Sequence, residues 1–147
     1  MAKKSKFKQS KLEQKSEYIK PSSIEGDDKI SFNFRRMRSD GDKFKYCDKD
    51  SRYFLKLVER LRDVCHLTPL ELKTSRSSSL KCHQINFADS RCTEDGFGFN
   101  SQDIDDNGWQ FEISQNEHGR IHGFFLENIF YVVWLDPKHE LYPGKKL

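Results

Sequence analysis

Residues 129–136 read Ile-Phe-Tyr-Val-Val-Trp-Leu-Asp, and this stretch decides the fold. Seven apolar residues in a row leave no polar face, so a strand formed here has to be covered on both sides. Pro137 follows directly and cannot donate to a sheet ladder, so it ends the strand. The sequence therefore predicts a central, covered strand in the last third of the chain.

A second strand precedes this one and forms a hairpin with it. Residues 120–126 are also largely apolar, and Glu127-Asn128 separates them from the central strand as a two-residue turn. The side-chain period of two then determines which residues share a face. The expected register pairs Leu126 with Ile129, His122 with Val133, and Arg120 with Leu135.

Other segments favour further strands and one long loop. Ile30–Phe34 and Trp109–Ile113 alternate apolar and polar residues, which is typical of half-buried strands, and His83–Phe87 alternates more weakly. Residues 88–108 are rich in Asp, Gly, Ser and Asn, and we expect a functional or mobile loop there. Gly96-Phe97-Gly98-Phe99 within it lacks the strand–turn–helix setting of a phosphate-binding loop.

Two helices are predicted between the strands. Tyr53–His66 carries apolar residues at helical spacing, which predicts an amphipathic helix. Its expected buried face consists of Phe54, Leu57, Val58, Leu61, Val64 and Cys65. Thr68-Pro69-Leu70-Glu71 has the pattern of a capping box with proline at the first helical position, so a short helix begins there.

Length and composition limit the number of domains. The chain has 147 residues, of which 35% are hydrophobic, enough for one modest core. We therefore expect one α+β domain over residues 29–147, with one long and one short helix packed on a mainly antiparallel sheet. Residues 1–28 are expected to form a Lys-rich flexible tail. No apolar run approaches the roughly 20 residues of a membrane helix, and no signal-peptide pattern is found, so we expect a cytoplasmic protein that does not enter membranes.

Positive charge is concentrated in the tail. The whole chain has a net charge of +3, but residues 1–20 alone carry +5, which leaves the rest at −2. A basic tail can bind nucleic acid, an acidic partner or an anionic membrane surface, or it can simply keep the protein soluble. The residues predicted to contact RNA phosphates are Lys3, Lys4, Lys6 and Lys8 in the tail, and Arg35, Arg36 and Arg38 after the first strand.

Neither the cysteines nor the common catalytic motifs indicate a function for this chain. Cys47, Cys65, Cys82 and Cys92 have no paired spacing, so we expect free thiols and neither a metal site nor a cofactor. The chain also lacks a nucleophile elbow, a P-loop and the HExxH zinc motif.

The densest group of chemically capable side chains is expected at one end of the sheet. Arg120 and His122 share a face of their strand, and the chain after the central strand brings His139 and Tyr142 toward the same end. Arginine can clamp a phosphate, and histidine and tyrosine can move protons. We therefore predict Arg120, His122, His139 and Tyr142 as catalytic residues; the alternative is that they only pair and pack as ordinary structural residues.

The order of these elements is similar to that of the RelE-like toxins of bacterial toxin–antitoxin pairs. The similarity includes Trp109–Ile113, residues 118–124 and 129–135, and the closing His139-Glu140-Leu141-Tyr142. It implies cleavage of mRNA on the ribosome, in which a ribose 2′-hydroxyl attacks its own phosphate. It also implies RNA, the ribosome and a cognate antitoxin as partners, and it matches Arg120, His139 and Tyr142 to the family's functional positions.

Two alternatives remain open. A nearly neutral folded part with an aromatic-rich sheet is also typical of a non-catalytic protein-binding module, for example one from a toxin–antitoxin, mobile-element or phage-defence system. The basic tail and the arginines near residue 36 would equally serve a protein that binds nucleic acid without cleaving it.

Overall fold

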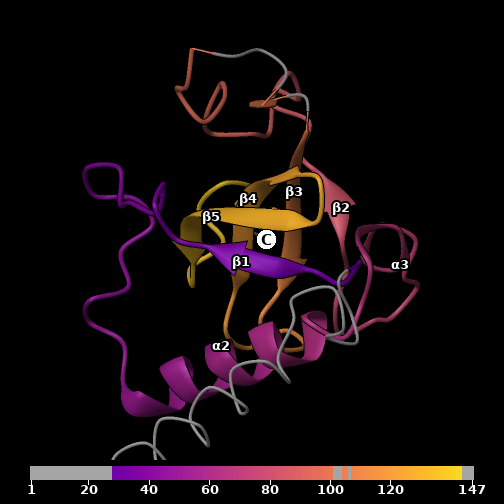
Figure 1. Cartoon of the computed structure of the whole chain (residues 1–147). Helices are drawn as coiled ribbons and strands as arrows, with labels where there is room; N and C mark the ends of the chain where they lie inside the picture. Colours follow the sequence, from indigo (N-terminus) through magenta and orange to yellow (C-terminus); the bar gives the residue numbers. More distant parts are fainter. Residues whose placement is uncertain (1–27, 101–103, 106, 144–147) are drawn as a thin grey trace, which may run out of the picture.

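The computed structural model describes residues 28–100, 104–105 and 107–143 (Figure 1). The predicted Lys-rich tail, residues 1–28, therefore lies outside the described residues except for Asp28. The elements are β1 (Ser31–Asn33), α2 (Ser51–Val64), α3 (Pro69–Lys73), β2 (His83–Gln84), β3 (Gly108–Glu112), β4 (Arg120–Leu126) and β5 (Ile129–Asp136). No helix among the described residues is long and apolar enough to cross a membrane.

The five strands form one mixed sheet in the order β1-β5-β4-β3-β2. β1 runs parallel to β5, whereas the other neighbouring strands pair antiparallel. β5 lies between β1 and β4, and residues Val132 to Asp136 are all buried. The predicted α+β class is confirmed, and the apolar run at residues 129–136 forms an interior strand.

The two faces of the sheet are covered in different ways. One face packs against α2, which runs beneath the sheet in Figure 1, and its core includes Leu57, Phe111 and Phe130. The other face is covered in the described structure by loops, whose Phe44 and Phe97 are fully buried. We call this second side the loop-covered face.

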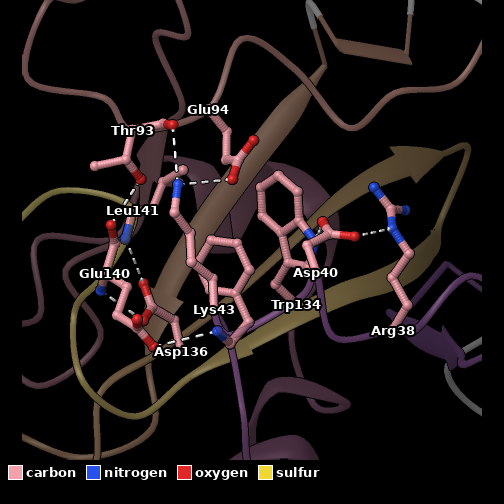
Figure 2. A network of polar contacts seen from close by, with 10 residues as sticks. Arg38, Asp40, Lys43, Thr93, Glu94, Trp134, Asp136, Glu140 and Leu141 are labelled. Atoms are coloured by element: carbon pink, nitrogen blue, oxygen red, sulfur yellow. Dashed lines mark hydrogen bonds and ion pairs between the residues drawn. The ribbon is translucent and has the colours of Figure 1, made fainter.

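Hydrogen bonds fasten the loops to this face (Figure 2). Trp134 Nε1 of β5 donates to Asp40 Oδ2 at 2.6 Å, and the Phe97 ring lies 5.0 Å from the Trp134 ring. Thr93 N donates to the Leu141 carbonyl at 2.9 Å, so the predicted loop at 88–108 is joined to the C-terminal segment. The described part of that loop therefore contributes core residues rather than only surface.

Helix α2 buries a different stripe from the one expected. Tyr53, Leu57 and Val64 are buried, but Phe54 and Val58 are exposed. Arg60 also lies on the inward side of the helix, and its guanidinium donates to the carbonyls of Ile113 at 2.9 Å and Ser79 at 3.0 Å. The predicted buried face is therefore correct at Leu57, Leu61 and Val64 and wrong at Phe54, Val58 and Cys65. The difference arises because a charged residue occupies an inward position, where backbone carbonyls satisfy it.

The helix ends follow local signals. Asp50 caps α2 by accepting the Tyr53 N–H at 3.1 Å. Thr68 Oγ1 accepts the Glu71 N–H at 3.1 Å, while Glu71 Oε1 accepts the Thr68 N–H at 3.2 Å. The predicted capping box is therefore confirmed, and α3 begins at Pro69.

The predicted hairpin register is correct near the turn and wrong at the far end of the hairpin. Residues pair as predicted from Leu126–Ile129 as far as Gly123–Val132, and the register then shifts by one residue. His122 consequently pairs with Trp134 and Arg120 with Asp136, instead of Val133 and Leu135. The cause is a β-bulge: Val133 and Trp134 both pack into the cluster on the loop-covered face, which strict alternation would prevent.

Candidate functional site

Asp136, the last residue of β5, organises the predicted sheet-end site. Its Oδ2 accepts from His122 Nε2 at 2.9 Å and from the Leu141 N–H at 3.1 Å. Its Oδ1 accepts from the Glu140 N–H at 2.7 Å (Figure 2). One buried carboxylate therefore joins β4, β5 and the C-terminal segment.

The protonation of the His122–Asp136 pair follows from this geometry. Burial lowers the His122 pKa, and it outweighs the opposing effect of the hydrogen bond to Asp136. Burial alone would raise the Asp136 pKa, but hydrogen bonds from His122 and two backbone N–H groups outweigh it and hold the pKa below its ordinary value. At neutral pH the pair is thus a neutral imidazole that donates to an ionised carboxylate.

His122 has no access to solvent in the described structure. Its side chain is 0% exposed and packs against the rings of Phe44 and Trp134, each at 6.2 Å. A general acid or base has to come within hydrogen-bond reach of its substrate. The structure therefore gives His122 a structural position rather than the contact with substrate that the predicted catalytic role requires.

Arg120 and His139 are the predicted catalytic residues that stay partly exposed beside Asp136. Arg120 pairs with Asp136 in the sheet, and the charges of Arg120 and His139 both lower the His122 pKa. His139 adopts a positive φ of 54°, which turns the chain back so that Glu140 and Leu141 reach Asp136. Arg120 and His139 are thus both partly exposed near the buried Asp136.

Tyr142 lies elsewhere. Its hydroxyl donates to the Asn86 carbonyl at 2.9 Å and accepts the Asn86 N–H at 3.0 Å. Burial raises its pKa to about 12, so the hydroxyl keeps its proton. Tyr142 borders a separate hollow of about 630 Å³, the edge hollow, whose wall includes His83, Asn86, Asp89, Arg91 and Gln110.

The tyrosine at the sheet end is Tyr53 of α2, which the sequence analysis assigned to no site. Tyr53 and His118 line a hollow of about 400 Å³ that also includes Arg52 and Glu117. Burial and then the Asp136 charge raise the Tyr53 pKa, and its hydroxyl has no hydrogen-bond partner among the described residues. In the sequence, Tyr53 begins the apolar pattern of the helix, and nothing in that pattern indicated that it would line a hollow at the sheet end.

The three predicted RNA-binding arginines separate into two kinds. Arg38 is structural: its Nε donates to Asp40 Oδ1 at 2.9 Å, its Nη2 donates to the Phe97 carbonyl, and it lies over the Trp134 ring. Arg35 and Arg36 are exposed, and neither forms an ion pair with another described residue. The predicted tail lysines, Lys3, Lys4, Lys6 and Lys8, lie outside the described residues.

Arg36 borders a third hollow, which we call the arginine–aromatic hollow. Its volume is about 530 Å³, and its wall includes Arg36, Phe99, Asn100, Phe124, Leu126 and Tyr131. The Arg36 guanidinium lies 5.3 Å from the centre of the Phe99 ring. Phe124 and Tyr131 are stacked in parallel at 5.0 Å. Phe99 belongs to the Gly-Phe-Gly-Phe segment at residues 96–99. In the sequence, this aromatic motif and the separate basic segment at residues 35–38 were the available signals for the hollow.

Metal-binding chemistry finds no support in the described part of the chain. No group of three or more His, Cys, Asp or Glu side chains there could hold a metal ion. The four cysteines are free thiols, and burial raises the pKa of Cys82 to about 12.

Comparisons with known proteins return no match: no family model, no curated protein and no solved structure is similar to this chain. The function is therefore argued from the residues and their geometry.

Proposed function

We propose that this domain binds single-stranded RNA through the arginine–aromatic hollow. The observation that carries the proposal is the exposed Arg36 guanidinium over Phe99, beside the stacked rings of Phe124 and Tyr131. Proteins that bind single strands combine positive charge along the backbone with rings on which bases stack. Arg35 and Arg36 supply the charge, and Phe99 and Tyr131 supply the rings.

The energy of base stacking and the unpaired arginine charges both favour RNA binding at this hollow. Stacking of one base on an aromatic side chain contributes about 1–3 kcal/mol. Arg35 and Arg36 face no carboxylate among the described residues, so their charges are available to phosphates. Arg38 holds the loop that carries Phe99, because it bonds to the Phe97 carbonyl and to Asp40, and its guanidinium also lies 5.3 Å from the centre of the Phe99 ring.

The test is binding of a labelled single-stranded RNA of about ten nucleotides, measured by fluorescence anisotropy. We expect Arg36→Gln to weaken binding about tenfold. The matched control is Arg52→Gln, since Arg52 is also exposed but lies on α2, away from the arginine–aromatic hollow. Equal affinity of wild type and Arg36→Gln would show that RNA does not bind at the arginine–aromatic hollow.

Cleavage of the bound RNA is the narrower form of the proposal. What supports it is the resemblance of the sequence to RelE-like toxins, together with the partly exposed Arg120 and His139 beside Asp136. In this form the protein is a toxin-like endoribonuclease that acts on mRNA at the ribosome. Arg120 would neutralise the phosphate and His139 would move the proton.

Expression in bacteria tests the cleavage. We expect growth arrest and fragmented mRNA with wild type, and neither with Arg120→Ala/His139→Ala. Retained arrest by this double variant, with the purified protein still folded, would sink the catalytic form and leave RNA binding in place.

A protein-binding module is the second candidate, and α2 favours it. Leu55 and Val58 on α2 are 56% and 61% exposed, and neighbouring Phe54 is also exposed. Contiguous apolar side chains on a surface often mark a protein interface. A partner such as an antitoxin should co-purify with wild type and be lost with Val58→Lys, whereas RNA binding should be unchanged.

A further inference from the structure

We infer that the edge hollow binds a nucleobase such as adenine. The hollow lies on the loop-covered face, between the β2 edge of the sheet and the C-terminal segment, and its volume of about 630 Å³ is in the range of small-ligand sites. The inference deepens the proposed function, since the base can come from RNA, but it stands on separate residues and is tested separately.

The inference starts from the buried side chain of Gln110. It lies on β3, paired with His83 on one side and His122 on the other, and it is only 6% exposed. Its Oε1 is buried and has no hydrogen-bond partner among the described residues. A buried carboxamide oxygen left without a donor is costly, so a ligand or water is expected to satisfy it.

The chemistry of a carboxamide selects the ligand. Its oxygen accepts one hydrogen bond and its nitrogen donates, which is the pattern that adenine complements with its exocyclic amine and a neighbouring ring nitrogen. Glutamine is accordingly a common partner of adenine. Uracil complements the same carboxamide with its N3–H and a neighbouring carbonyl, so Gln110 recognises the hydrogen-bonding edge of a base and does not by itself exclude uracil.

The other walls of the hollow suit a planar base. The Tyr142 hydroxyl is held at both the N–H and the carbonyl of Asn86, so its ring is fixed in position. His83 borders the same hollow from β2 and is exposed. Aromatic and histidine side chains are the usual stacking partners of unpaired bases.

A cation at the same hollow suits the phosphate of a nucleotide. Arg91 lines the hollow, and Asp89 orients it through contacts of 3.1 Å to Nε and 2.8 Å to Nη2. Arginine presents five N–H donors, so this anchoring leaves the guanidinium able to bind a phosphate oxygen as well.

The experiment titrates the full-length protein with AMP and, separately, with ribose 5-phosphate, which lacks the base, by isothermal calorimetry. We expect AMP to bind and ribose 5-phosphate to bind at least tenfold more weakly. Gln110→Met keeps the length of the side chain and removes the carboxamide, so we expect about a tenfold loss of AMP affinity. The matched control is Gln115→Met, because Gln115 is exposed on the turn between β3 and β4 and lies outside the hollow.

The outcomes separate this inference from the proposed function. Absence of AMP binding, or equal AMP affinity of wild type and Gln110→Met with both folded, overturns the inference whatever RNA does at Arg36. If AMP binds and oligo(A) displaces it, the base comes from RNA. If AMP binds and oligo(A) does not compete, the site takes a free nucleotide, and the inference then holds even where the RNA proposal fails.

Discussion

His122 Nε2 donates to Asp136 Oδ2 over 2.9 Å, and both side chains are buried, with exposed fractions of 0% and 1%. The pair spans β4 and β5 at the point where the β-bulge has shifted their register. Because Asp136 also accepts two N–H groups of the C-terminal segment, the same carboxylate holds Glu140 and Leu141 in place. The position of His139 between these contacts therefore depends on a buried ionic hydrogen bond.

The first prediction concerns the stability that Asp136 provides. Asp136→Ala leaves His122 and two backbone N–H groups buried without an acceptor, and we expect a loss of about 3–5 kcal/mol in the free energy of unfolding. Urea denaturation followed by circular dichroism measures it. Asp48→Ala is the control: Asp48 is exposed and lies 4.0 Å from Lys138, so we expect a loss below about 1 kcal/mol.

The second prediction is acid sensitivity. Because the folded His122 pKa lies below the ordinary 6.5, the unfolded chain binds more protons as the pH falls through that value. Stability should therefore be complete above pH 6.5 and decline below it; Asp136, whose pKa is lowered from 3.8, adds a further decline in stronger acid. Denaturation curves between pH 8 and pH 5 measure the slope.

The control for acid sensitivity is His122→Gln, whose amide can still donate to Asp136 but does not titrate. Its stability should change less between pH 8 and pH 5 than that of wild type. Identical slopes would contradict the assignment of this pH dependence to His122.

The third prediction concerns the glycine at the register shift. A Cβ on Gly123 would overlap the carbonyl oxygen of Tyr131 and lie 2.6 Å from Phe130 Cε1. Backbone cannot move aside as a flexible side chain can, so Gly123→Ala should destabilise by about 3 kcal/mol or more. Gly41→Ala has open space and suffers only its positive φ, so about 1–2 kcal/mol is expected. Equal thermal shifts of the two variants would show that β4 can yield at this position.

The fourth prediction separates Arg36 from Arg38. Arg36→Gln should leave the melting temperature unchanged and lower the salt dependence of RNA binding by about 0.7 in log K against log salt, as one lost phosphate contact predicts. Arg38→Gln should instead lower the melting temperature, since Asp40 and the Phe97 carbonyl lose their donor. Anisotropy at several salt concentrations and thermal denaturation measure both; a reversed assignment would contradict the proposed division of roles.

Local signals made much of the fold predictable. The apolar run at residues 129–136 identified β5, and Glu127-Asn128 identified the hairpin, whose first turn residue adopts the positive φ of 55° that such turns need. The capping box at Thr68 and Glu71 is also local, because its partners are three residues apart. Each of these features is written in neighbouring residues.

The residues that shape the site were harder to predict, because their partners are distant in the sequence. Tyr142 shares the expected end of the chain with His139, yet it bonds to Asn86, and Tyr53 reaches the sheet end from a helix. Gln110 gave no signal, because a glutamine in an alternating strand normally faces solvent, and only the overlying loops bury it.

The sequence by itself determined which segments become strands and helices, where the helices are capped and which strand lies inside the sheet, since hydrophobic period, turn residues and capping pairs act over a few positions. Packing between distant residues decided that His122 is buried against Asp136, that Arg38 is structural while Arg36 stays exposed, and where the edge hollow and the arginine–aromatic hollow open. The β-bulge and the path of the loops set these positions. Both arise from packing between distant residues, where a shift of one position changes every cross-strand partner beyond it.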